Sequence, residues 1–457
     1  MSWAMPNTFA YIMLACWPIV AIALFATMTP PRALVWGLLG GYLLLPVKTA
    51  FDFPGIPSID KTSIVNLSVL GAALLFSNGR VLRLPREWWL IALMLVYVCS
   101  PIMTVRGNPD TLVFGSTLLP RLRPYDALSM AGNHIIELIP VVMGYNIFNT
   151  TRARHELLRG FAIAILGYSV LMLVEVRLSP QFHNWVYGFF PHSFFQQIRD
   201  GGFRPVVFLG HGLQVAIFAA IGTIAASHFA KLDKNILSLP ARIWVLYLLL
   251  VVFLCRSLGP LILLLGALSI LALFRAKRIF LICALIAGTV LIYPALRSSD
   301  MVPVQWVADQ AALLDQDRAA SFQTRVDNEN ALLAKANKRP LFGWGGYARN
   351  HVYDEINGRD LSITDGEWII VIGTFGWIGY LAKFGLLCLP VITAWRSREL
   401  TSAEGATLAL LLTVNILDSL PNASIHNYTW LLVGTLAAAR TSKSRAKPLP
   451  FTERSVA

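Results

Sequence analysis

Residues 321–347 read SFQTRVDNENALLAKANKRPLFGWGGY, the middle of a polar segment that extends over about 297–364. Long apolar runs flank this segment, and 56% of the chain is hydrophobic, with a mean hydropathy of +0.60. Most of the chain is therefore expected to lie in lipid. A segment that carries Arg325, Asp327 and Glu329 is costly to bury in hydrocarbon. The sequence predicts an extramembrane lobe on one face of a helical bundle.

The apolar runs predict an all-α polytopic membrane protein with about 12–13 transmembrane helices, because each helix needs roughly 17–25 mostly apolar residues. The runs lie near residues 9–28, 32–47, 62–79, 88–105, 127–149, 157–177, 205–229, 241–255, 257–274, 279–296, 366–395, 404–418 and 425–440. Those at 32–47 and 241–255 are short enough to be re-entrant or tilted pieces. The predicted parts are a bundle at 1–296, a large, partly helical loop lobe at 297–364, C-terminal helices at 365–440 and a basic tail at 441–457.

Lysine and arginine gather on every second connection, which indicates the cytoplasmic side. The clusters are Arg80, Arg83 and Arg86; Arg152, Arg154 and Arg159; Lys231, Lys234 and Arg242; Arg275, Lys277 and Arg278; Arg396 and Arg398; and Arg440, Lys443, Arg445, Lys447 and Arg454. The lobe is then periplasmic in a bacterial inner membrane, and the C-terminus is cytoplasmic. The net charge of +13 follows mainly from this topology and predicts no nucleic-acid partner. Membrane lipid is the expected partner of the tail.

No cofactor or metal is predicted from the residue pattern. The five cysteines all fall in or beside apolar runs, so we expect no disulfide framework. The glycines near residue 345 follow no predicted strand, which argues against a P-loop or a dinucleotide fingerprint.

A first candidate site is the segment GFRPVVFLGHG at residues 202–212. Pro205 is well placed to open a helix, which predicts Arg204 at the outer mouth of a span and His211 about two turns below it. The alternatives are an interface anchor for Arg204 and an interhelical hydrogen bond for His211.

A second candidate is CRSLGP at residues 255–260, which interrupts a long apolar stretch. It predicts two helices joined by a tight turn, with Arg256 at their outer end. Arg256 is either a substrate contact or a cation that anchors the turn.

A third candidate lies in the lobe. Residues 318–337 have helical composition and include Arg325, and Pro340 with the following glycines is expected to end this helix. The loop after it supplies further candidate substrate-binding residues, which are Arg339, Gly343, Trp344, Gly345 and Tyr347.

A fourth candidate is TDGEW at residues 364–368, where the chain re-enters the membrane. Asp365 and Glu367 at a helix start are favoured by the helix dipole. The alternative is a general base at the junction of lobe and membrane, beside a sugar contact at Trp368. GWIG follows at residues 376–379.

Arginines recur on the predicted outer face at positions 204, 256, 325 and 339. Guanidinium groups bind phosphate and diphosphate in a bidentate manner. Arginines that stabilise a diphosphate leaving group need no metal.

The order and spacing of these motifs resemble the O-antigen ligase and Wzy-type polymerase superfamily over about 200–395. Arg204–Gly212 is similar to the family's arginine-led helix start, and RSLG at 256–259 to its serine/arginine/glycine turn. Arg325 followed by PLFGWG at 340–345 is similar to the loop arginine and the "PLxGxG" segment. GWIG is similar to the family's GxxG.

The resemblance implies a metal-independent glycosyltransferase that takes an undecaprenyl-diphosphate-linked oligosaccharide as its donor. It implies Arg204 and Arg325 as diphosphate ligands, with Arg256 assisting. Ligases of the superfamily carry a histidine and one further polar residue, then nine residues, then GxxG, and Asp365 stands at the position of that histidine here. This departure favours a polymerase of exopolysaccharide or O-antigen repeat units, with a lipid-linked repeat unit as the glycan acceptor and a chain-length regulator as a further partner. Asp365 or Glu367 is then the candidate base.

Three alternatives remain. An O-antigen ligase would transfer the polymer to lipid A-core. A flippase or other transporter of lipid-linked glycans would normally show internal repeats, and the sequence shows none. A membrane O-acyltransferase would need a buried catalytic histidine.

Overall fold

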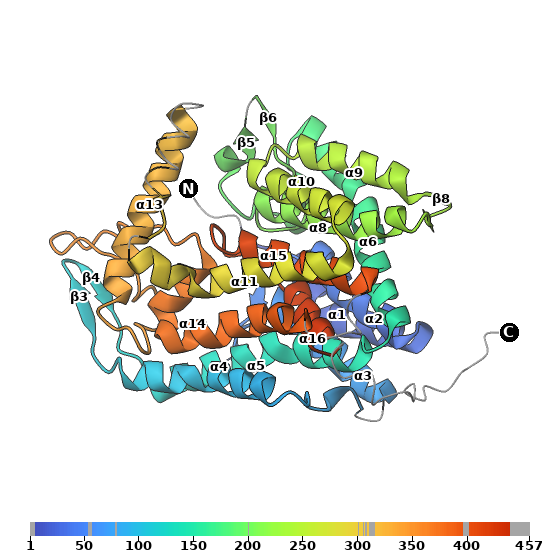
Figure 1. The fold of residues 1–457 in the computed structure, drawn as a ribbon. Helices are drawn as coiled ribbons and strands as arrows, with labels where there is room; N and C mark the ends of the chain where they lie inside the picture. Colours follow the sequence, from blue (N-terminus) through green and yellow to red (C-terminus); the bar gives the residue numbers. More distant parts are fainter. Residues whose placement is uncertain are drawn as a thin grey trace.

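The structure is a computed structural model that describes residues 5–53, 57–77, 80–199, 201–299, 301–304, 306, 309, 316–395 and 402–438. Helices dominate it (Figure 1). The predicted basic tail at 441–457 lies outside these residues.

Most of the helices follow the apolar runs of the sequence, whereas α7 and α13 lie in the polar connections between runs. They are α1 (Thr8–Thr27), α2 (Pro30–Leu44), α3 (Lys61–Ser77), α4 (Trp88–Arg106), α5 (Pro124–Ile147), α6 (Thr151–Leu178), α7 (Phe182–Tyr187), α8 (Gly212–Lys231), α9 (Ala241–Leu254), α10 (Leu258–Leu273), α11 (Ala276–Ser298), α13 (Gln316–Ala336), α14 (Glu367–Ala394), α15 (Ala403–Asp418) and α16 (Asn427–Ala438), with short 3-10 turns at Arg80–Leu82 and Phe194–Gln197.

In the part of the chain that the structure describes, four small antiparallel hairpins occupy the connections. They pair β1 (Ala50–Phe51) with β2 (Ile59–Asp60), β3 (Leu112–Phe114) with β4 (Thr117–Leu119), β5 (Ile198–Arg199) with β6 (Gly202–Phe203), and β7 (Asn235–Ile236) with β8 (Leu239–Pro240). The predicted all-α class is confirmed.

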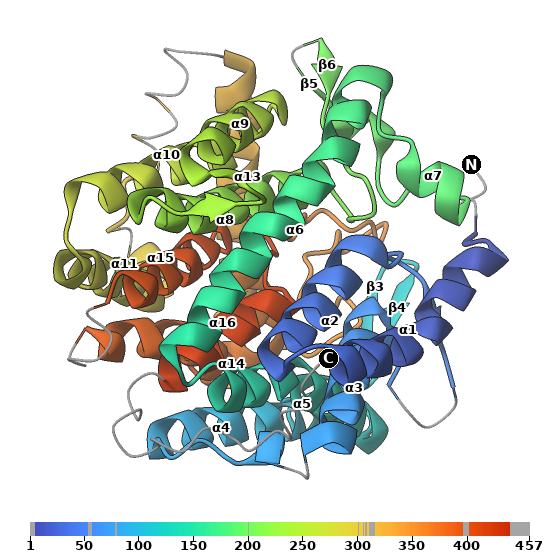
Figure 2. The same ribbon diagram turned by 90° about the vertical axis from the view of Figure 1, so that its right-hand side faces the viewer.

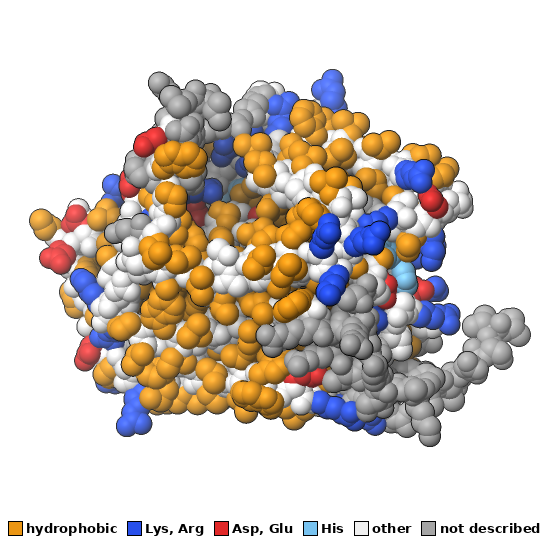
Figure 3. All heavy atoms as spheres, viewed as in Figure 1, with side chains coloured by type: hydrophobic (Ala, Val, Ile, Leu, Met, Phe, Trp, Pro, Cys, Tyr) orange, Lys and Arg blue, Asp and Glu red, His pale blue; other side chains and the backbone are white. Residues whose placement is uncertain are grey.

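Within the described residues, seven helices are long and apolar enough to cross a membrane, namely α1, α4, α5, α6, α8, α11 and α14. Three shorter apolar helices are α3, α9 and α10. Large apolar side chains cover the outside of the bundle (Figure 3), including Leu75, Leu128 and Leu246, which are 67%, 70% and 68% exposed. A surface of this kind suits hydrocarbon and is rare on soluble proteins.

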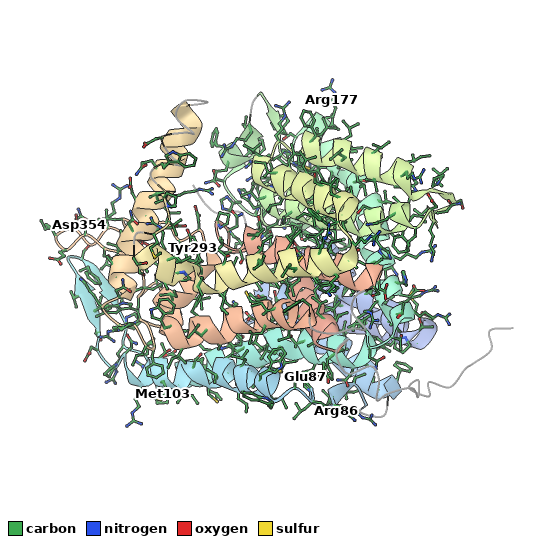
Figure 4. All side chains as sticks on the ribbon, in the orientation of Figure 1. Arg86, Glu87, Met103, Arg177, Tyr293 and Asp354 are labelled. Atoms are coloured by element: carbon green, nitrogen blue, oxygen red, sulfur yellow. The ribbon has the colours of Figure 1, made fainter. Side chains whose placement is uncertain are left out.

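The lobe lies at one end of the bundle. Helix α4 runs from Trp88, next to Glu87, to Arg106, and Asp354 of the lobe lies beyond its Met103 end, far from Arg86 (Figure 4). Helix α13 stands across this end of the bundle (Figure 1). In the view along the bundle, α6 crosses between the α1–α3 group and the α8–α10 group (Figure 2).

The lobe is joined to the bundle by a break in helix α14. Gly376 leaves helical geometry, with φ 67° and ψ −168°, a conformation open essentially only to glycine. The main-chain N–H groups of Trp377 and Ile378 donate to the carbonyl oxygens of Pro340 and Leu341, at 2.7 and 3.2 Å. A helix broken inside a membrane protein must have its freed polar groups paired in this way.

The same loop also donates to the first half of α14. The N–H groups of Trp344 and Gly345 donate to the carbonyl oxygens of Gly373 and Thr374, both at 2.9 Å. Gly343 has φ +66°, and a Cβ atom there would lie 2.5 Å from the Thr374 carbonyl. The two glycine motifs therefore fit each other: one breaks the helix and the other supplies the loop that fills the break.

Candidate functional site

Charged side chains gather in a hollow at the lobe end of the bundle. In the space-filling view the hollow opens between α13 and the α9–α10 pair, and both basic and acidic groups are visible in it (Figure 3). The predicted site residues of α8, the α9–α10 turn, α13 and the start of α14 come from the elements that border it.

The segment before α8 is not the predicted helix start. Helix α8 begins at Gly212, and residues 204–211 are irregular. The backbone of Val207 is left-handed, with φ 51°, which an α-helix does not contain. Buried Glu175, in the last turn of α6, holds this conformation, because its Oε2 atom accepts the N–H groups of Val206 and Val207, both at 2.7 Å. His211 is the N-cap of α8 and does not lie two turns down from Arg204.

Arg204 is 7% exposed and points at the α9–α10 turn. Its Nε and Nη2 atoms both donate to the main-chain carbonyl oxygen of Arg256, at 3.2 Å each. Arg256 has φ 51° and its own Nη1 atom donates to the carbonyl of Arg199 on β5. The predicted tight turn is confirmed, and within it the Arg256 backbone orients Arg204.

The pKa of His211 is affected by two of the candidate arginines. Its Nδ1 atom accepts the Leu213 N–H at 3.0 Å, so in the neutral ring Nε2 carries the hydrogen. Burial lowers the pKa of His211 to about 4, and the positive charges of Arg204 and Arg325 add to this effect. Arg204 and Arg325 thus both affect one imidazole from two different elements.

The two predicted carboxylates have different partners. Asp365 lies 3.5 Å from Nε of Arg325, and both side chains are more than 40% exposed, so this ion pair is weak and open to exchange. Glu367 is buried and pairs with Lys383 at 2.6 Å within α14. A carboxylate held in a buried ion pair is a poor base, so we retain only Asp365 of the two as a candidate.

The predicted sugar contacts of the loop have structural partners. Arg339 donates to Oδ1 of Asn108 at 2.6 Å and lies 4.4 Å from the ring centre of Trp344. The ammonium group of Lys335 is also over the Trp344 ring, at 5.0 Å. Two cations therefore hold Trp344, and Arg339 anchors the lobe to the end of α4.

The remaining aromatic candidates differ in exposure. Tyr347 is 57% exposed and donates to Oδ1 of Asp126 at 2.8 Å, so its ring is accessible. Trp368 is fully buried, with Tyr293 packed edge-on against it at 5.2 Å. Trp368 is thus not a sugar platform in this structure, whereas Tyr347 keeps a free ring face. Gly343 and Gly345 serve the interlock with α14.

Three residues of the site were not among the predicted ones: Glu175, Arg297 and Glu329. Arg297 in the last turn of α11 is 4% exposed and hydrogen-bonds Asn330 of α13 at 2.5 Å. Glu329 lies one helical turn after Arg325. The sequence held a signal for two of these residues. Glu175 is an acidic residue at the end of a predicted span, and Glu329 lies four residues after Arg325.

A separate cavity of about 540 Å³ lies beside the start of α5, lined by Pro109, Arg121, Leu122, Arg123 and Pro124. None of these residues belongs to the site described above. Among the described residues, no group of three or more His, Cys, Asp or Glu side chains could hold a metal ion.

The fold and site together define a multi-pass helical membrane protein with a guanidinium-rich hollow at one end. Residues 243–384 match the family model Wzy_C, described as O-antigen ligase. This match contains the Arg256 turn, α13 and the GxxG break, and it confirms the resemblance to the O-antigen ligase and Wzy-type superfamily. No curated protein and no solved structure matched the chain.

The family match supports a ligase- or polymerase-type, glycosyltransferase-like function in polysaccharide biosynthesis. With the apolar helices, it indicates a multi-pass protein of the bacterial inner membrane. Such a family implies lipid-linked glycan substrates.

Proposed function

We propose that this protein polymerises exopolysaccharide or O-antigen repeat units, transferring an undecaprenyl-diphosphate-linked glycan to a sugar hydroxyl of another lipid-linked unit. The observation that carries the proposal is that Arg204 and Arg325 come from distant elements and act together on His211. The lobe is then periplasmic, and the reaction occurs at the outer leaflet.

The two arginines would hold the diphosphate and stabilise the charge that develops on it as the glycosidic bond breaks. Arg204 is preset by the Arg256 carbonyl, so its guanidinium loses little freedom on binding. Arg325 would break its weak ion pair with Asp365 and bind the diphosphate instead. The Nε2–H of neutral His211 adds a third donor, and no metal is needed in this scheme.

The identity of the acceptor is inferred from Asp365, the residue at the position of the ligase histidine. Ligases of the superfamily carry a histidine there, whereas this chain has Asp365, which pairs with Arg325. This favours a polymerase. The description of the matching family favours an O-antigen ligase as the second candidate.

The experiment is a deletion strain complemented with wild-type or variant protein, with radiolabelled sugar followed into glycans. Loss of long ladders, with single repeats still exported, supports a polymerase. Full-length polymer that stays unattached identifies a ligase, and single units trapped inside identify a flippase. Normal polymer in the deletion strain would refute all three.

A further inference from the structure

The junction of lobe and bundle holds a second group of polar side chains, here called the junction cluster: Arg297, Glu329 and Trp368. They belong to the last turn of α11, to α13 and to the first turn of α14. Three separate elements thus meet at one carboxyl group.

Two N–H donors of this cluster are buried without a well-formed hydrogen bond. Nε of Arg297 meets no acceptor at hydrogen-bond distance among the described residues, and Nε1 of Trp368 has only a weak interaction with the Glu329 carboxyl, although the two side chains are 4% and 0% exposed. Leaving a buried donor unpaired costs about 1–3 kcal/mol. Two of them at one place call for a functional explanation.

Both donors lie close to Glu329. Burial raises the pKa of Glu329 to about 7. The charge of Arg297, the indole N–H of Trp368 and the charge of Arg325 each limit this rise, whereas the charge of Asp365 adds to it. Together these influences leave the pKa of the carboxyl group near neutral pH, where a general base is most effective.

The position of Glu329 relative to Arg325 supports a role in the reaction. Residues four apart on a helix share a face, so the Glu329 carboxyl lies beside the guanidinium that we assign to the diphosphate. Of the two other carboxylates, Glu367 is held by Lys383 in a buried ion pair, whereas Asp365 is an exposed group in a weak ion pair with Arg325.

We infer that Glu329 is the general base that takes the proton from the acceptor sugar, with Arg297 and Trp368 as positioning residues. The inference rests on the proposed function. The acceptor O–H bond breaks and its proton goes to the Glu329 carboxylate. The oxygen electron pair forms the new bond to the anomeric carbon. The bond from that carbon to the phosphate oxygen breaks, its electron pair leaves on undecaprenyl diphosphate, and the proton later passes to water.

The test uses full-length protein in membranes and lipid-linked repeat units extracted from the deletion strain. Glu329→Gln should lower the initial rate of polymer formation about 100-fold or more. It should also remove the rise in rate between pH 6 and pH 8, a window placed about one unit either side of the base's pKa. Binding of undecaprenyl diphosphate, measured as a thermal shift, should stay within about twofold of wild type, since a base takes no part in holding the diphosphate.

The matched control is Asp327→Asn, because Asp327 is an exposed acid on the same helix, bonded by Gln323 at 2.9 Å. It should keep the wild-type rate and pH profile. Trp368→Phe removes one indole donor, so it should move the midpoint of the pH profile upward and keep measurable activity.

The possible outcomes separate two failures. A wild-type rate and pH profile in Glu329→Gln would overturn the assignment of the base and leave the proposed function intact. If Glu329→Gln does not insert, an unmoved midpoint in Trp368→Phe overturns the assignment instead. Wild-type protein that joins no units overturns the proposed function, and this inference with it.

Discussion

The Arg204 guanidinium donates two hydrogen bonds to the carbonyl oxygen of Arg256, a residue 52 positions later in the chain. The left-handed backbone of Arg256, at φ 51°, turns that carbonyl toward Arg204. One arginine motif of the sequence thus positions the other. The motif at 255–260 therefore contributes to the site through the main-chain carbonyl of Arg256, independently of the Arg256 side chain.

We predict that Arg325→Ala lowers glycan transfer by about 100- to 1000-fold, the usual effect of removing one donor that stabilises developing charge. Arg325→Lys should recover little of it, because an ammonium group lacks the planar fork that binds two phosphate oxygens. Ladder formation in the complemented deletion strain gives the readout. Long polymer at wild-type levels in Arg325→Ala would remove this residue from the site.

Glu175→Gln should impair the site without touching substrate. The carboxylate accepts N–H groups from Val206 and Val207 at 2.7 Å and from Phe182 at 2.8 Å. Hydrogen bonds to a charged group contribute about 1.5–3 kcal/mol each, so we expect a lower thermal stability in detergent and at least about a tenfold loss of transfer.

The control for that variant is Glu156→Gln, on the same helix but in an exposed pair with Arg32. Exposed pairs contribute about 0–1 kcal/mol, so this variant should behave like wild type. Equal effects of the two substitutions would contradict the role given to Glu175.

Gly376→Ala should destabilise the protein by at least about 1–3 kcal/mol, because no other residue readily adopts this backbone geometry. The added Cβ would also lie 2.4 Å from the Leu341 carbonyl. Gly288→Ala in α11 is the matched control, since a Cβ there meets nothing within 4 Å. Fluorescence-detected size exclusion after heating compares the two. Similar melting points would speak against the interlock.

Lys383 and Glu367 should show strong coupling. Breaking a buried pair by removing one partner costs about 3–5 kcal/mol, because an unpaired buried charge remains. We therefore expect Lys383→Met to be less stable than the double variant Lys383→Met with Glu367→Gln. Measured additivity of the two single effects in thermal melts would rule this out.

Glu329 should make stability depend on pH. Its pKa is about 7 in the folded protein, against the ordinary value of 4.5, so the folded state holds the proton more tightly. Its contribution to stability is full below pH 4.5 and is lost as pH rises through about 7. Glu329→Gln should flatten the melting temperature over this range, and an unchanged slope would show that other groups cause it.

Much of this fold follows from hydrophobic runs alone. The predicted helical class, the tight turn at Arg256 and the helix over 318–337 all agree with the structure. These features depend on residues close together in the chain. The helix start at Pro205 was predicted wrongly, because Val207 has a left-handed backbone that is held by hydrogen bonds to Glu175, about thirty residues earlier.

The site was less predictable for the same reason. Arg204 and Arg325 could be chosen as cations on the outer face, and the structure brings them near one imidazole. Trp344 and Trp368 were read as sugar contacts from their type, but their rings are taken by neighbouring cations and by burial. The pKa of Glu329 depends on residues of two other helices, α11 and α14, so no local sequence pattern predicts it.

The interlock at Gly376 means that the loop at residues 340–345 and helix α14 fold as one cooperative unit. Four main-chain hydrogen bonds join residues 340–345 to residues 373–378. A fragment cut out at residues 297–364 would leave each of those groups without its counterpart. Tension exerted on the lobe, for example by a lengthening polymer, would be passed directly to the membrane-crossing part of the chain.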